Sequence, residues 1–318
     1  MRAATGGLLL GCGLLGYALT RAALAPRSRA PAPPRLAPPT ASPRSSAERV
    51  TGTARRLNAS AAMLAFSVLA DSGLEHYRGS FQNRAMYTPL VVSAFTLAGS
   101  VAGMADARPT RHVVRDVIYG AAALTGFAGF GFHAWNITKR PGGLSWLNLF
   151  YAAPIGAPIA MTLAGLMGRA AERVRDGAGD QEPTLLDAPA GTVLGATCAV
   201  GLLGTVGEAG LLHFRGAYHN PAMLLPVTLP PVAAALVAAC TISPSPMRLR
   251  VARLWLRLTA ALGIIGVGFH AYGVSRNMGG WRNWSQNILN GPPLPAPPSF
   301  TGLAIAGLAA LDLIEGAA

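Results

Sequence analysis

Four histidines recur in two pairs at a fixed spacing along the chain. His76 and His133 are matched by His213 and His270, each 137 positions later. Neutral imidazole is a common axial ligand of haem iron, and it also binds Zn, Cu and Ni. The spacing therefore predicts that all four histidines are ligands. The simpler interpretation is that each is a polar tip reaching a membrane interface.

Two helices that present imidazoles at one depth can ligate a single iron from both sides. The predicted pairs are His76 with His133 and His213 with His270, giving one or two haem b groups, with a swapped pairing as the alternative. A single transition-metal ion held by all four rings competes with this scheme and requires each ring nitrogen to lie within about 2 Å of the ion. The three cysteines form no C-x-x-C pair, so neither a zinc knuckle nor c-type haem attachment is indicated.

Glycines precede two of the histidines at helical spacing. The segments 126–135 and 263–272 both read G-x-x-G-x-G-F-H-A-[WY]. On a helix, residues four and seven positions before a histidine share its face. The bare strips formed in this way consist of Gly126, Gly129, Gly263 and Gly266. They are explained either by close helix packing or by a flat ligand such as haem, and we predict that they bind the cofactor.

Basic residues follow each histidine at matching distances. Arg78 and Arg215 lie two positions after one type of histidine, and Lys139 and Arg276 lie six positions after the other. Guanidinium groups bind carboxylates in a bidentate manner, so these side chains are predicted to hold haem propionates. The alternative is that they extend from the bilayer to water without a ligand.

Asp71 and Glu208 occupy equivalent positions five residues before His76 and His213. A carboxyl group in hydrocarbon is costly unless it is neutral or paired, and by default it marks a functional site. We predict that this pair accepts a hydrogen bond from a histidine or relays protons to a quinone. Glu75 is replaced by Leu212 in the second half and is therefore less central.

The composition is that of a polytopic membrane protein. The chain is 51% hydrophobic and 12% charged, with a mean hydropathy of +0.38, whereas soluble domains carry about 25% charged residues. The net charge of +13 invites a nucleic-acid interpretation. We exclude it, because the arginines lie in short loops between apolar segments and none of the usual nucleic-acid motifs is present.

The predicted fold is all-α, with eight transmembrane helices in two four-helix repeats and an additional N-terminal hydrophobic segment. Residues 1–25 are a signal peptide or a helix, 26–56 a disordered Pro/Arg-rich linker, 57–190 the first repeat and 191–318 the second. The expected spans are 58–77, 86–105, 117–137, 149–168, 191–213, 222–242, 256–274 and 298–316. An even number of spans in each repeat predicts a pseudo-twofold axis along the membrane normal.

The loop charges predict the orientation. Eighteen arginines fall on the side of residues 21–56, 108–115, 169–175 and 248–257, and seven basic residues fall on the other. By the positive-inside rule the first side is cytoplasmic, which places the histidines at the periplasmic face of a bacterial inner membrane. A cleaved signal at residues 1–25 would invert this assignment.

These features favour a haem-b-binding, non-catalytic subunit that passes electrons between a periplasmic redox partner protein and quinone. A transporter or channel with duplicated halves is the main alternative, since such proteins place polar sites between repeats. A histidine-rich transition-metal-binding membrane protein is a second. A membrane-embedded enzyme that transfers protons through the acids and histidines is a third.

Overall fold

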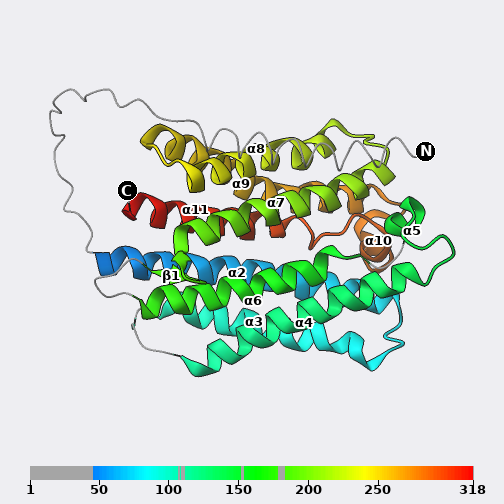
Figure 1. The fold of residues 1–318 in the computed structure, drawn as a ribbon. Helices are drawn as coiled ribbons and strands as arrows, with labels where there is room; N and C mark the ends of the chain where they lie inside the picture. The colour runs from blue at the N-terminus through cyan, green and yellow to red at the C-terminus, as the bar shows by residue number, and fades with distance from the viewer. Residues whose placement is uncertain (1–45, 107, 109–111, 152–153, 178–182, 318) are drawn as a thin grey trace.

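The computed structural model describes residues 46–317 except 107, 109–111, 152–153 and 178–182. The predictions for residues 1–45 lie outside this range. The long helices run side by side in one bundle, with the first half of the chain on one side and the second half on the other (Figure 1). The helices are α2 (Ser46–Arg78), α3 (Thr88–Ala105), α4 (Val113–Thr138), α5 (Trp146–Tyr151), α6 (Gly156–Asp176), α7 (Ala190–Arg215), α8 (Leu225–Ile242), α9 (Pro246–Arg276), α10 (Trp284–Asn290) and α11 (Pro298–Ala317).

Short elements complete the bundle. The 3-10 helices η1 (Arg84–Tyr87), η2 (Pro221–Leu224) and η3 (Gly280–Asn283) precede α3, α8 and α10. A two-stranded antiparallel hairpin, β1 (Thr184–Leu185) with β2 (Ala188–Pro189), connects α6 to α7. The polypeptide between residues 46 and 317 is otherwise helix and loop where the structure describes it.

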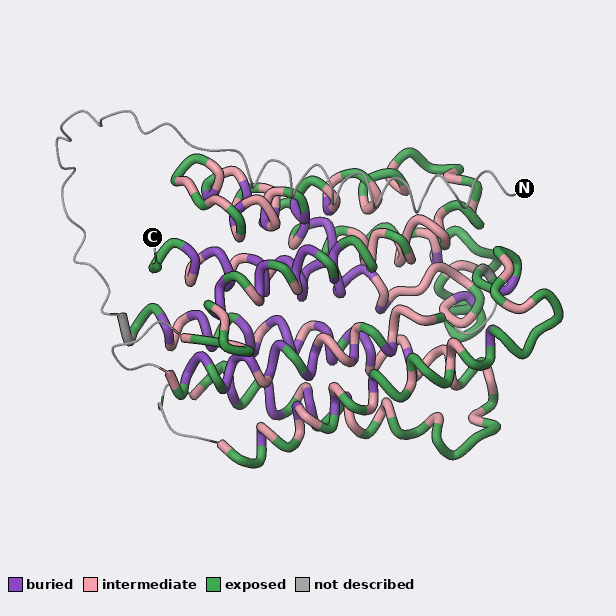
Figure 2. The backbone as a smooth tube through the Cα atoms, viewed as in Figure 1, coloured by how far each residue is buried: buried purple, intermediate pink, exposed green. Residues whose placement is uncertain are grey.

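Seven helices among the described residues are long and apolar enough to cross a membrane. They are α2, α3 with η1, α4, α7, α8 with η2, α9 and α11. Buried residues gather in the middle of the bundle on α2 and α11, whereas large apolar side chains on α4 are exposed outwards (Figure 2). This outward apolar surface suits lipid. The predicted class, an all-α multi-pass membrane protein, is confirmed.

The fourth predicted span is misplaced. We expected a helix over residues 149–168, but α5 ends at Tyr151 and α6 begins only at Gly156. The reason is Pro154, which has no backbone N–H and so cannot continue the hydrogen bonding of a helix. Helix α6 instead extends to Asp176 and buries two charged side chains, Glu172 and Arg175, and it is not among the seven apolar helices.

The linker prediction is also wrong for residues 46–56, which form the first turns of α2. Val50, Ala54 and Leu57 are 8%, 0% and 0% exposed. Their spacing of four and three residues places them on one face of the helix, which packs into the core. The residues between these three are Thr, Gly and Arg, in a segment rich in Ala, Ser and Arg, and this composition concealed the apolar face in the sequence.

Equivalent segments of the two halves adopt the same local backbone. Ser80 and Phe81 have φ values of 55° and 45°, and Ala217 and Tyr218 have 54° and 46°. Asn83 and Asn220 each begin a 3-10 helix, and their side chains accept hydrogen bonds of 2.9 Å from Ala85 N and Ala222 N respectively. Glycines 142 and 143 have φ values of 89° and 52°, matched by 80° and 52° at glycines 279 and 280.

Helix packing repeats in the same order. The pairs α2–α3, α3–α4 and α4–α6 in the first half correspond to α7–α8, α8–α9 and α9–α11 in the second. The short helices α5 and α10 lie at one end of the bundle (Figure 1). This end, where α2, α4, α7 and α9 finish, is called the histidine end. The other, where α2 begins and α11 finishes, is called the opposite end.

Candidate functional site

All four predicted histidines lie at the histidine end and make the same kind of contact. Each is half-buried near the end of its helix and shares a hydrogen bond between Nδ1 and a backbone carbonyl. The carbonyls are those of Met86 for His76 (2.6 Å), Met223 for His213 (2.7 Å), Pro293 for His270 (2.7 Å) and Pro154 for His133.

These carbonyls fix the tautomer of the imidazoles. A carbonyl oxygen can only accept, so Nδ1 must carry the proton and donate it. Nε2 of each neutral ring then keeps its lone pair. A metal-ligating histidine usually donates its Nδ1–H to a backbone carbonyl or carboxylate, because this bond orients the ring and raises the basicity of the other nitrogen. The four rings thus share the chemistry of a ligand.

The rings pair within each half of the chain. The centroids of His213 and His270 lie 6.5 Å apart, with an angle of 66° between the ring planes. Two imidazoles that face one metal from opposite sides have centroids about 6 Å apart, since each metal–nitrogen bond is about 2.0–2.1 Å. His76 and His133 are also close enough to interact electrostatically. Helices α7 and α9 pack mainly against α8 and α11, so the histidine pair bridges helices that otherwise touch little.

The glycine strips have a different role from the predicted one. A Cβ atom on Gly126 would collide with the Pro158 carbonyl and Thr162 of α6, and one on Gly263 would lie 2.8 Å from the Pro297 carbonyl and also meet Thr301 of α11. A Cβ atom on Gly266 would lie 2.8 Å from Pro297 Cβ, and one on Gly129 would make ordinary contact with Pro158 Cβ at 3.5 Å. Neighbouring helices therefore fill both strips. The prediction that a flat cofactor lies along these four glycines is wrong, and close helix packing explains them.

The basic residues at the rim have partners within the chain. Arg78 pairs with Glu75. The guanidinium of Arg215 lies 4.6 Å from the ring centroid of Tyr151, and Nζ of Lys139 lies 5.0 Å from that of Trp135. Such cation–π contacts are common where a cation and an aromatic ring share an interface.

The fourth basic residue, Arg276, is exposed at the end of α9. The rim is thus strongly basic, with Glu75 neutralising one of its charges. A propionate-binding role for Arg78, Arg215, Lys139 and Arg276 stays a prediction.

The two predicted acids meet between the halves of the chain. Asp71 and Glu208 are both half-buried and interact electrostatically. Oε1 of Glu208 accepts a hydrogen bond of 3.2 Å from the backbone N–H of Gly156, at the first turn of α6. A carboxylate is favoured there by the unpaired amides and dipole of the helix N-terminus. An acid from the second half thus binds a helix of the first.

Asp71 differs from Glu208 in the backbone group that lies at the equivalent position. In the second half, Pro297 just before α11 and Thr301 within it are the equivalents of Pro158 and Thr162 of α6. The same offset makes Pro295 the equivalent of Gly156. Proline carries no backbone N–H, so it cannot donate to Asp71 as Gly156 donates to Glu208. Ser67 Oγ instead donates to the Pro295 carbonyl at 2.5 Å. The two acids are therefore equivalent in position but different in hydrogen bonding.

A single four-histidine metal centre does not form. Within the described part of the chain, no three His, Cys, Asp or Glu side chains lie close enough together to hold a metal ion. No family model matches the chain, and no curated protein or solved structure is significantly similar to it. The histidine end is thus characterised by two separate imidazole pairs.

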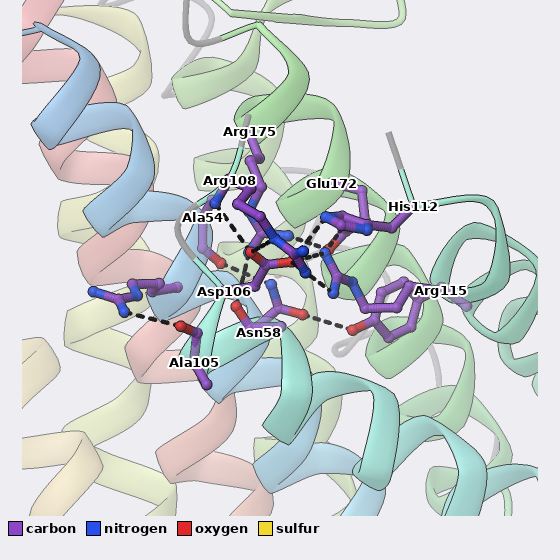
Figure 3. Close-up of polar contacts among 12 residues, drawn as sticks. Ala54, Asn58, Ala105, Asp106, Arg108, His112, Arg115, Glu172 and Arg175 are labelled. Atoms are coloured by element: carbon purple, nitrogen blue, oxygen red, sulfur yellow. Dashed lines mark hydrogen bonds and ion pairs between the residues drawn. The ribbon is translucent and has the colours of Figure 1, made fainter. Parts of the chain in front are cut away.

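A second polar site lies at the opposite end and was not predicted. Asp106, Arg115 and Glu172 converge between α3, α4 and α6 (Figure 3). Asp106 binds His112 Nε2 at 2.8 Å, Arg108 Nε at 3.0 Å and Arg115 Nη1 at 3.2 Å. Glu172 binds Arg115 Nη2 and Arg175 Nη1, each at 2.8 Å. We call these six residues the charged cluster.

The charged cluster continues into the core through neutral groups. Arg175 Nη2 donates to the carbonyl of Gly103 at 2.8 Å, near the end of α3. Tyr119 donates its hydroxyl proton to Asn58 Oδ1 at 2.6 Å. Glu172 and Arg175 are 1% and 0% exposed. The network therefore connects α2, α3, α4 and α6 inside the bundle.

The second half of the chain is apolar at the equivalent place. Residues Asn58, Arg115, Tyr119, Glu172 and Arg175 are replaced there by Gly195, Ala252, Leu256, Leu311 and Ile314, all of them buried. Apolar residues often stabilise a protein as well as a buried ion network does, so this helix arrangement does not require the charges. A position-by-position comparison of the two halves would have revealed the cluster from the sequence. It was missed because Arg115 was assigned to a loop.

Acid is expected to weaken the charged cluster through Asp106. The hydrogen bonds and charge of Arg108, with a contribution from Arg115, hold the pKa of this carboxyl well below its usual range. Between that lowered pKa and the ordinary value of about 4, the unfolded chain binds more protons than the folded one. The stability that Asp106 contributes is thus present above about pH 4 and is lost as the pH falls through this range.

The thermal unfolding midpoint in detergent, followed from pH 7 to pH 3, tests this expectation. The midpoint should fall less steeply for Asp106→Asn than for the unaltered protein. Asp187→Asn is the matched control, because Asp187 is an exposed residue of the β1–β2 turn. Equal slopes for the unaltered protein and Asp106→Asn would contradict the assignment.

Proposed function

We propose that the protein consists of two four-helix repeats, α2–α6 and α7–α11, related by a pseudo-twofold axis along the membrane normal. The matching turns, the repeated order of helix packing and the four equivalent histidine–carbonyl bonds support this arrangement. All eight long helices then cross the bilayer, with α6 carrying charges at its inner end. We place the protein in a bacterial inner membrane, where the positive-inside rule orients the histidine end toward the periplasm.

We further propose that each histidine pair holds haem b and that the protein transfers electrons. The observation that carries this proposal is the shared tautomer: four imidazoles, each with Nδ1 donated to a carbonyl, keep Nε2 as a ligand. The 6.5 Å separation of the His213 and His270 rings suits bis-imidazole ligation of one iron. The ligand set fits haem iron, which would supply reversible one-electron transfer.

The remaining residues contribute binding and proton transfer. The carbonyls of Met86, Met223 and Pro293 orient the rings, so little rearrangement is needed when a ligand binds. Asp71 and Glu208 lie beneath the histidines and are placed to exchange protons with quinone as electrons arrive. The basic rim suits an acidic periplasmic redox partner.

An optical spectrum of the detergent-purified protein tests this function. We expect a Soret band and, after reduction, an α-band near about 560 nm, as bis-imidazole b-type haem gives. The pyridine haemochrome assay then measures haem per chain, with one or two expected. A colourless protein after expression with added haem precursor would contradict the proposal. If that protein held neither metal nor haem, a transporter built from duplicated halves would replace it.

A further inference from the structure

Helix α3 carries a row of buried hydroxyl groups on one face. Ser93, Thr96 and Ser100 follow each other at spacings of three and four residues, and each is 0% exposed. Residues at this spacing share a face of a helix. The row therefore forms a polar stripe along one buried face of α3.

This stripe faces α2. A Cβ atom on Gly103, one turn beyond Ser100, would collide with the Asn58 side chain of α2. Helices α2 and α3 are joined by a short loop and pack against each other. They therefore run antiparallel, so residues later in α3 lie beside residues earlier in α2. With a helical rise of about 1.5 Å per residue, successive hydroxyls are about 4.5–6 Å apart along the axis. One water molecule bridges polar atoms at that separation.

The stripe connects two polar sites. At the opposite end it begins at Asn58, which is bonded to Tyr119 beside the charged cluster. At the histidine end it continues to Ser72 of α2, which is 6% exposed, next to Asp71. We call the stripe together with Asn58 and Ser72 the hydroxyl seam.

Packing alone accounts for part of the hydroxyl seam. Ser93 Oγ donates to the Pro89 carbonyl at 2.5 Å, and Thr96 Oγ1 donates to the Val92 carbonyl at 2.7 Å. Hydroxyls in membrane helices often bond back to their own helix in this way, which leaves the oxygen lone pairs as acceptors. Ser100 Oγ differs, because this fully buried atom makes no hydrogen bond of normal geometry among the described residues, although the Tyr119 hydroxyl lies near enough to interact with it. A buried polar atom in that position is usually satisfied by an internal water.

The second half of the chain shows that the helices pack without these hydroxyls. Ser93, Thr96 and Ser100 of α3 correspond to Pro230, Ala233 and Val237 of α8, and these are also buried. Asn58 and Ser72 correspond to Gly195 and Ala209 of α7. The α7–α8 pair thus has the same architecture with an apolar interface. This helix architecture therefore does not require the hydroxyls of the first half.

We propose that the hydroxyl seam is a proton pathway through the first half of the protein, leading from the charged cluster to Asp71. A proton enters from the solution at the opposite end, where Asp106 and His112 lie near the surface. It passes between bridging waters and the oxygens of Ser100, Thr96 and Ser93, each accepting one proton and releasing another.

At the histidine end the Asp71 carboxylate accepts the proton and then releases it to the solution on that side, which regenerates the carboxylate. Each hydroxyl is likewise regenerated after a proton has passed, so one proton leaves at the histidine end for each one taken up at the opposite end. No oxidant or reductant is needed. The pathway does not depend on haem binding and is tested separately from it.

Proton flux into liposomes tests the pathway. The full chain is reconstituted with pyranine trapped inside, and a potassium diffusion potential with valinomycin drives protons across the membrane. The unaltered protein should acidify the interior faster than protein-free liposomes. The triple variant Ser93→Ala/Thr96→Ala/Ser100→Val, which gives α3 small apolar residues like those of α8, should reduce the initial flux at least tenfold. Asp71→Asn should reduce it similarly.

Two further variants keep the result interpretable. Thr205→Val is the matched control: Thr205 donates to its own helix at Gly201 O (3.0 Å), and the first half has Val68 at the equivalent position. Its flux should equal that of the unaltered protein. If the triple variant does not fold, as judged by its circular dichroism and elution profile, Ser100→Val alone should still interrupt the flux. Flux that is unchanged by Ser100→Val, or an unaltered protein no faster than empty liposomes, would overturn the proposal.

Discussion

Replacing His270 by Ala should remove the haem held by the second half of the protein and leave that of the first half in place. His213→Ala should have the same result, because the two rings lie 6.5 Å apart and act as one ligand pair. The haem content per chain is expected to fall by about half, since loss of one axial imidazole leaves a single ligand. The pyridine haemochrome assay measures this ratio directly.

The double variants separate the two sites. His133→Ala/His270→Ala should abolish haem binding, whereas His213→Ala/His270→Ala should bind as much haem as either single variant. His219→Ala is the control: this histidine also lies at the histidine end, but it is exposed and bonds the carbonyl of Gly216 in its own turn. Full haem retention in His133→Ala/His270→Ala would exclude the proposed ligands.

The second large effect is expected from the glycines of α4 and α9. Gly126→Ala and Gly263→Ala each introduce a methyl group where the backbone of α6 or the segment entering α11 already lies in contact. Because backbone cannot move aside as a flexible side chain can, each variant should lose about 1–3 kcal/mol of stability. Thermal unfolding in detergent should show a clear fall in the midpoint for both.

The same helices provide the controls. Gly131 and Gly268 lie two residues before the histidines, with no atom within 4 Å of an added Cβ. Gly131→Ala and Gly268→Ala should leave the midpoint unchanged or raise it, since alanine favours a helix over glycine by about 1 kcal/mol. If all four variants unfold alike, the glycines do not act through helix contact.

The duplication could be predicted from sequence because it preserves side chains with specific tasks. His76 and His213 each bond a carbonyl ten residues further on, and Asn83 and Asn220 each cap the helix that follows. Such contacts are local, so a fixed residue type at a fixed spacing predicts them. Seven apolar helices were likewise predictable from length and composition.

Other features depend on long-range packing that no local pattern encodes. The glycine at position 126 looks the same whether a cofactor or Pro158 lies against it, and only the position of α6 distinguishes them. The charged cluster joins Arg115 to Glu172 across 57 residues, and its burial depends on α6 extending beyond the predicted span. The beginning of α2 was missed because Val50 is the one large apolar residue on its buried face, beside Thr53 and Ala54.

The difference between α3 and α8 determines how many proton pathways of the proposed kind one molecule contains. A homodimer of identical subunits carries every residue twice and so presents every route twice. Here one covalent chain has Ser93, Thr96 and Ser100 on one side and Pro230, Ala233 and Val237 on the other. Among the described residues, a single molecule therefore has two chemically similar imidazole pairs but one row of buried hydroxyls, so the proposed proton pathway belongs to the first half alone.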